Sequence, residues 1–152
     1  MVQELSKSEM GKLLKSNVIG HLAYVQGNTP YVVPITYYYD EDSHALISYT
    51  SEGHKLTTMR SNGLLALCVT EINAMKEWRS VVAHGSFEEL TGSTAKHTLR
   101  TFYEGILENL ADRKEGSQNF LEDLSAHTKD DNIPVVYRIN IQELTGKCRL
   151  DL

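Results

Sequence analysis

The chain has 152 residues, of which 41% are hydrophobic and 23% charged, as expected for one globular domain spanning residues 1–152. Its formal net charge of −5 argues against a general surface for nucleic acid or acidic membranes, so an anion site must be built locally. No window approaches 18 uninterrupted apolar residues, and residues 1–16 lack the apolar segment of a signal peptide. We therefore expect a cytoplasmic protein that binds neither membranes nor nucleic acid.

The first part of the chain predicts a helix followed by a β-hairpin. Ser6 and Glu9 have the spacing of a capping box, and the apolar residues after them fit one face of a short helix. Residues 18–25 and 31–39 flank a Gly-Asn turn and predict the two strands of the hairpin. Because Pro34 cannot donate a backbone hydrogen bond, the second strand should be interrupted there or lie at a sheet edge.

Residues 45–62 predict a strand, a turn at Gly53 and a helix. Such a connection leaves backbone N–H groups free at the start of the helix, where they attract anions. Hydroxyl and basic side chains accompany these N–H groups at Thr50, Ser51, His54 and Lys55. The stretch is therefore a candidate phosphate-sized cradle. The alternative is an ordinary strand-to-helix connection with solvated Lys and His side chains.

Three more strands are predicted in the second half of the chain. Residues 64–70 form a continuous apolar run typical of a buried strand, and residues 134–141 show the alternation of a final strand. Residues 78–90 predict a long strand that bends at Gly85.

The helices of the second half are predicted from capping and periodicity. Thr94 can cap a helix whose apolar residues recur every three or four positions up to Leu110. Residues 111–119 are polar and predict a loop, and residues 120–126 predict a short helix. About six strands, mostly joined by hairpins and flanked by helices, indicate an α+β fold built on a small antiparallel β-barrel.

The spacing of reactive residues along the chain indicates neither a catalytic motif nor a metal site. The six histidines are scattered and no metal-binding motif is present, so no metal site is expected, although one histidine would suffice as an axial haem ligand. No nucleophile motif or pair of catalytic carboxylates is found, and the catalytic residues remain unassigned. Cys68 and Cys148 lack a C-x-x-C spacing, which indicates reduced structural thiols.

Several segments, taken in order, carry a family resemblance. The chain resembles the flavin-binding split barrels related to pyridoxamine 5′-phosphate oxidase, and within them the short branch that includes nitroimidazole-resistance-type proteins. The resemblance covers about residues 5–147. It is carried by PITYYYD at 34–40, ISYTSEGHK at 47–55, RSN at 60–62, RSVVAHG at 79–85 and ELTGK at 143–147.

The resemblance implies a split barrel and a homodimer that holds one FMN at each of two sites in the subunit interface. By position, four residues would line the isoalloxazine ring, namely Val33, Pro34, Ile35 and Thr36. Tyr49 and Thr50 match the pair beside the ribityl phosphate, and His54 and Lys55 match the pair that binds the phosphate. Ser80 falls where relatives place a polar residue against the flavin.

The function implied is that of an oxidoreductase, which passes a hydride through the flavin to or from a small-molecule substrate, with NAD(P)H as a candidate electron donor. Oxidation of pyridoxamine 5′-phosphate itself is not expected, because the chain ends at Leu152 without the Arg-x-His motif of the full oxidases. Two alternatives stay open. One is a non-catalytic flavin- or haem-binding module, and the other is a deazaflavin (F420) reductase on the same barrel.

Overall fold

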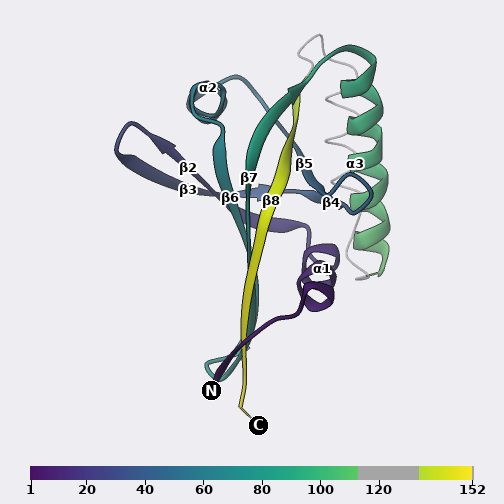
Figure 1. The fold of residues 1–152 in the computed structure, drawn as a ribbon. Coiled ribbons are helices and arrows are strands. Elements are labelled where there is room, and N and C mark those ends of the chain that lie inside the picture. The colour runs from purple at the N-terminus through teal and green to yellow at the C-terminus, as the bar shows by residue number, and fades with distance from the viewer. Residues whose placement is uncertain (113–133, 152) are drawn as a thin grey trace.

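The computed structural model describes residues 1–112 and 134–151, which form eight strands and three helices (Figure 1). The strands are β1 Val2–Glu4, β2 Ile19–Gln26, β3 Thr29–Thr36, β4 Tyr38–Asp40, β5 Ala45–Thr50, β6 Leu64–Ala74, β7 Glu77–Leu90 and β8 Val135–Leu150. The helices are α1 Lys7–Ser16, α2 His54–Ser61 and α3 Gly92–Asp112. No helix in these described ranges is long and apolar enough to cross a membrane.

All eight strands belong to one antiparallel sheet with the order β3-β2-β6-β7-β8-β5-β4, and β1 pairs with β8. The two strands at the ends of this order, β3 and β4, are consecutive in the chain and only Tyr37 separates them. The Tyr37 N–H donates to the carbonyl of Val18 at 2.8 Å, and its hydroxyl donates to the carbonyl of Leu14 at 2.7 Å. The sheet therefore curls into a barrel that stays open between β3 and β4, and the predicted α+β split barrel is confirmed.

The prediction of about six strands was too low, because β1 and β4 have only three residues each. Segments of this length show no periodicity of their own, and they become strands by pairing with β8 and β5. The last strand also continues to Leu150, well past its predicted end at residue 141.

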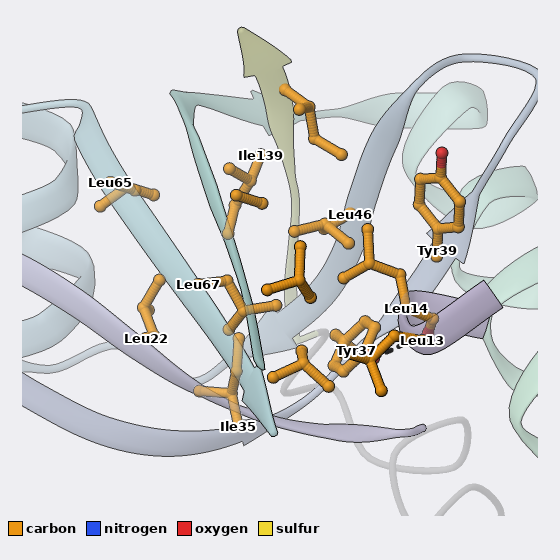
Figure 2. Packing of buried hydrophobic residues seen from close by; sticks show 14 of the residues in the cluster. Leu13, Leu14, Leu22, Ile35, Tyr37, Tyr39, Leu46, Leu65, Leu67 and Ile139 are labelled. Atoms are coloured by element: carbon orange, nitrogen blue, oxygen red, sulfur yellow. Dashed lines mark hydrogen bonds between the residues drawn. The ribbon is translucent and has the colours of Figure 1, made fainter. Parts of the chain in front are cut away.

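The main core fills the inside of the barrel, and α1 covers one end of it (Figure 2). Leu13 and Leu14 of α1 point into this core and are 3% and 0% exposed. The predicted capping box is present, since the Glu9 N–H donates to the Ser6 hydroxyl at 3.2 Å and the Ser6 N–H donates to the Glu9 carboxylate at 2.7 Å. The cap fixes where α1 begins, and the apolar face of α1 then seals the barrel.

A second core lies outside the barrel, where α3 packs along β4, β5 and β8 (Figure 1). Phe102, Tyr103 and Ile106 of α3 are almost fully buried against Ile47 and Val136 of the sheet. The helix starts at Gly92, two residues before the predicted cap at Thr94. Residues 111 and 112 continue α3 rather than starting a loop, and the rest of that predicted loop and the helix at 120–126 lie outside the described residues.

Two predictions from single residues are confirmed by the sheet. Strand β3 pairs only with β2, so Pro34 lies on an edge strand, and the interruption falls at Tyr37 rather than at Pro34 itself. The register between β7 and β8 shifts between His84 and Gly85. A Cβ atom at Gly85 would come within 2.3 Å of the carbonyl oxygen of Asn140, which explains why glycine occupies the bend.

Candidate functional site

The predicted strand, turn and helix around Gly53 are present as the end of β5, a short turn and α2. We call residues 50–55 the cradle. Gly53 is the N-cap of α2, no side chain caps the helix, and its first turn has no acidic residue. A Cβ atom placed on Gly53 would meet nothing within 4 Å, so the space in front of the helix start is open. No side chain therefore accepts a capping hydrogen bond from the first N–H groups of α2.

Lys55 is half-buried in the first turn of α2. Burial away from water lowers the pKa of its ammonium group. Within the described part of the chain, no carboxylate forms an ion pair with Lys55. A partly desolvated cation without a counterion is unfavourable by itself, and an anion at the cradle would relieve this cost.

His54 joins the start of α2 to the hairpin of β2 and β3. Its Nε2 shares a hydrogen bond with Oε1 of Gln26, and its ring meets the ring of Tyr31 edge-on at 5.0 Å between centroids. Tyr31 in turn stacks on Tyr24 at 5.3 Å. Because Oε1 is an acceptor, Nε2 carries the hydrogen, and only Nδ1 is left for another ligand. Nδ1 can donate to a phosphate only when the imidazole is protonated.

The two predicted residues at the end of β5 face opposite sides of the strand. The ring of Tyr49 packs edge-on against Phe102 of α3 at 5.4 Å, in the second core. The hydroxyl of Thr50 donates to the carbonyl of Ser51 at 3.2 Å, so it would have to rotate to donate to an anion. Thr50 thus belongs to the cradle, whereas the side chain of Tyr49 supports the strand from behind.

The edge strand β3 contacts the region of the cradle at two points. At one end of β3, the Ser48 hydroxyl donates to the carbonyl of Thr36 at 2.8 Å, and towards the other end Tyr31 contacts His54. Between these contacts, Val33 and Ile35 point into the core, while Pro34 points outwards. Residues 33–36 therefore lie between a contact with His54 of the cradle and a contact with Ser48, two residues before the cradle. Because β3 has a partner on one side only, part of its backbone N–H and C=O groups remain available.

Ser80 does not join this group within one chain. It lies on β7, which β2 and β6 separate from β3 in the sheet. Neighbouring strands are spaced about 4.8 Å apart, so three steps place Ser80 roughly 14 Å from β3 when the path follows the curved sheet. The neighbour of its hydroxyl is the Cys68 sulfur at 3.6 Å, and Cys68 and Cys148 are free thiols.

The outer face of β3, β2 and β6 carries exposed apolar side chains. Val32 is 63% exposed on β3, Ile19 is 59% exposed on β2, and Leu64 is 69% exposed on β6. The register aligns Val32 with Ala23 and Ala23 with Ala66. The exposed apolar side chains therefore share one face of the sheet, on which the exposed His21 also lies. We call it the outer apolar face, and Ser80 lies on the same side of the sheet. Exposed apolar side chains gathered on one face of a sheet are typical of an interface.

Several contacts of the cradle gave no signal in the sequence. Gln26 is 28 residues from His54, and Glu89 is 29 residues from Arg60, with which it forms an ion pair. Such pairs exist only once the hairpin and β7 have been placed beside α2. Among the described residues, no three His, Cys, Asp or Glu side chains gather as metal ligands.

Comparison with known proteins identifies relatives over nearly the whole chain. Residues 6–148 match the family described as pyridoxamine 5′-phosphate oxidase. An FAD-binding protein of Mesorhizobium loti is 28% identical, the match covers 99% of this chain and 98% of that one, and the TM-score is 0.77.

Two further solved structures share the fold at 15% identity. One is an FAD- and haem-binding protein of Mycobacterium smegmatis, with a TM-score of 0.71 and coverage of 96% of this chain and 72% of that one. The other is a candidate 5-nitroimidazole antibiotic resistance protein of Bacteroides thetaiotaomicron, with a TM-score of 0.69 and coverage of 100% and 92%. These matches confirm the family resemblance drawn from the sequence motifs.

Proposed function

The chain belongs to the pyridoxamine 5′-phosphate oxidase family, and we propose that it binds a flavin nucleotide, FMN, in the cradle beside the free edge of β3. The observation that carries the proposal is Lys55, a half-buried cation that has no carboxylate partner among the described residues and lies at an uncapped helix start. The name of the Mesorhizobium loti relative, an FAD-binding protein, supports a flavin as the ligand.

The donor set of the cradle fits a phosphate group. A phosphate is a compact anion with several acceptor oxygens, and the cradle offers backbone N–H groups of α2, the ammonium of Lys55 and the hydroxyls of Thr50 and Ser51. His54 would add a donor through Nδ1 when it is protonated. All of these donors come from one short segment, so one phosphate could contact several of them at once.

The isoalloxazine ring would then lie along β3. The ring has a polar edge with both donors and acceptors, and those backbone groups of residues 33–36 that do not pair with β2 or Ser48 would offer partners to it. Pro34 lacks an N–H and is exposed, so it would present a flat apolar surface rather than a donor. A bound flavin would supply the two-electron chemistry, while these residues would bind and orient it.

We also propose that the protein is a homodimer in which a second copy covers the outer apolar face. The exposed apolar side chains on β3, β2 and β6 support this assembly. The position of Ser80 supports it as well, since two strands separate Ser80 from β3 within one chain and Ser80 lies on the face that the second copy would cover. In the dimer, the partner subunit's Ser80 would approach the flavin held by the first copy, and the site would be incomplete without it.

For the reaction, we propose that the holoprotein transfers a hydride from NAD(P)H to a small-molecule acceptor. The support is the redox activity by which the family is described. The family and the cradle would equally fit a carrier that binds flavin without turnover, so the two functions are separated by experiment. A haem-binding module would instead use an axial side chain and would not need the cradle.

The test begins with apoprotein titrated separately with FMN, FAD, riboflavin and haem, followed by absorbance and flavin fluorescence. We expect tight binding of FMN, weaker binding of riboflavin because it lacks the phosphate, and no haem spectrum. Tighter binding of FAD than of FMN would keep the flavin site but reject FMN. Bleaching of the bound flavin by NAD(P)H under anaerobic conditions would support the enzyme over the carrier. Failure to bind any flavin would refute the proposed function.

A further inference from the structure

An arginine at the end of α2 reaches back to the cradle and holds one of its residues. Arg60 lies in the last turn of α2, and its Nη1 and Nη2 donate to the two carboxylate oxygens of Glu52 at 3.1 and 3.2 Å. The same guanidinium donates to Glu89 of β7 through Nε at 3.0 Å and through Nη2 at 2.5 Å. Glu52, Arg60 and Glu89 therefore form one connected set of charges, in which β7 anchors the arginine and the arginine holds the cradle.

Glu52 is the residue that makes this arrangement necessary. It lies within the cradle, three residues before Lys55, and its side chain is 69% exposed. A freely moving carboxylate there would repel a phosphate, and it could also occupy Lys55 as an internal ion-pair partner. In the structure, both oxygens of Glu52 are engaged by the fork of Arg60 instead.

We propose that Arg60 is a positioning residue that makes the cradle selective for the phosphate of a flavin nucleotide by holding the Glu52 carboxylate away from it. This inference rests on the proposed flavin site. Arg60 supplies the positive charge that compensates the Glu52 carboxylate, and its two parallel hydrogen bonds fix the direction in which that carboxylate points. Glu89 completes the device by fixing Arg60 against the sheet, since its own side chain is only 30% exposed.

In the part of the chain that the structure describes, no second basic side chain forms an ion pair with Glu52. Among the described residues, Arg60 is the basic side chain that forms an ion pair with Glu52, and the two carboxylates raise the pKa of Arg60, Glu89 more than Glu52. Arg60 thus stays charged at any pH at which the fold persists. Exposed ion pairs contribute little to folding, so the loss of Arg60 should be felt in ligand binding more than in stability.

The experiment compares FMN with riboflavin, which shares the ring but lacks the phosphate. For Arg60→Gln, we expect the Kd for FMN to rise roughly tenfold at low ionic strength, the scale of one uncompensated charge near an anion. The Kd for riboflavin should stay unchanged. Adding Glu52→Gln to this variant should restore FMN binding to within about twofold of wild type, because the repelling charge is gone. Arg100→Gln, which removes an exposed arginine from α3, is the matched control and should change neither Kd.

The outcomes separate this inference from the proposed function. If the wild type binds FMN and Arg60→Gln binds it equally well, the role of Arg60 is refuted and the flavin site stands. An equal loss for FMN and riboflavin that Glu52→Gln does not restore would make Arg60 merely structural, which also refutes the inference. A wild type that binds no flavin refutes both. If Arg60→Gln fails to fold, Arg60→Lys replaces it, since lysine cannot make two parallel bonds to Glu52, and the same FMN-specific, rescuable loss is required.

Discussion

Replacing Lys55 with methionine tests the cradle most directly. Methionine keeps an unbranched apolar stem of similar length, so packing in the first turn of α2 should be preserved while the charge is removed. A hydrogen bond to a charged group contributes about 1.5–3 kcal/mol, which corresponds to a rise of about 10- to 150-fold in the Kd for FMN. Riboflavin should bind the variant nearly as well as the wild type, because the lost contact is to the phosphate.

Lys55→Met should not lower the folding stability of the apoprotein. Burial lowers the pKa of Lys55 in the folded state, so the unfolded chain binds the proton more tightly than the folded one does. Stability of the apoprotein should therefore rise with pH through the window between the lowered folded pKa and the ordinary value of 10.5. Lys55→Met removes this dependence and should melt no lower than wild type at neutral pH.

The assays are quenching of flavin fluorescence for the Kd and thermal melting of the apoprotein between neutral pH and pH 10. Lys12→Met, which removes an exposed lysine from α1, is the matched control and should change neither flavin affinity. An unchanged Kd for FMN in Lys55→Met would refute the cradle as a phosphate site. An equal loss of FMN and riboflavin affinity would show that the substitution had disturbed the site rather than removed a phosphate contact.

Three further predictions concern the fold and the assembly. Gly85→Ala should lower the free energy of unfolding by about 1–3 kcal/mol through overpacking at the bend, whereas Gly11→Ala, where nothing lies within 4 Å, should stabilise α1 by about 0.5–1 kcal/mol. Denaturant unfolding of both variants measures the contrast, and a Gly85→Ala protein as stable as wild type would contradict the close approach. The backbone N–H of Ser6 lowers the pKa of Glu9 more than any other group, so Glu9→Ala should melt at a lower temperature than wild type at neutral pH. This difference in melting temperature should vanish as pH falls from 4.5 through the lowered folded pKa, and a difference that persists in acid would refute this cause. Light scattering of the wild type should give the mass of a dimer, twice 17.1 kDa or about 34 kDa. Leu64→Glu should give a monomer with weakened flavin binding, and a dimeric Leu64→Glu protein would place the interface elsewhere.

The features that sequence patterns predicted are local ones. The capping box at Ser6 and Glu9 involves atoms three residues apart, and the turn at Gly53 is followed directly by its helix. Pro34 indicated an edge strand because its missing N–H is a property of the residue itself. In each case, the residues that determine the feature lie within one turn or one strand, so the sequence alone is enough to predict it.

The features that the patterns missed depend on distant partners. The short strand β4 exists because β5 pairs with it, and the arginine pair with Glu89 spans 29 residues. Sequence motifs grouped Ser80 with the residues of the cofactor site, although two strands separate it from β3 within one chain. Motif order along the chain does not reveal how many strands separate two residues in the sheet.

The order of strands has a consequence for how the protein is made. Strand β8 follows the other seven described strands in the chain, yet it lies in the middle of the sheet between β7 and β5, and it pairs Ala45 with Asn140 across 95 residues of chain. Until β8 is available, β5 has only the three residues of β4 beside it, although its first four side chains are destined for burial. The nascent chain must therefore carry an apolar strand with an open edge through most of its synthesis, which slows folding and invites association with other chains. Ribosome-stalled chains that end before residue 135 should accordingly remain protease-sensitive at β5, and protection should appear only after β8 has emerged.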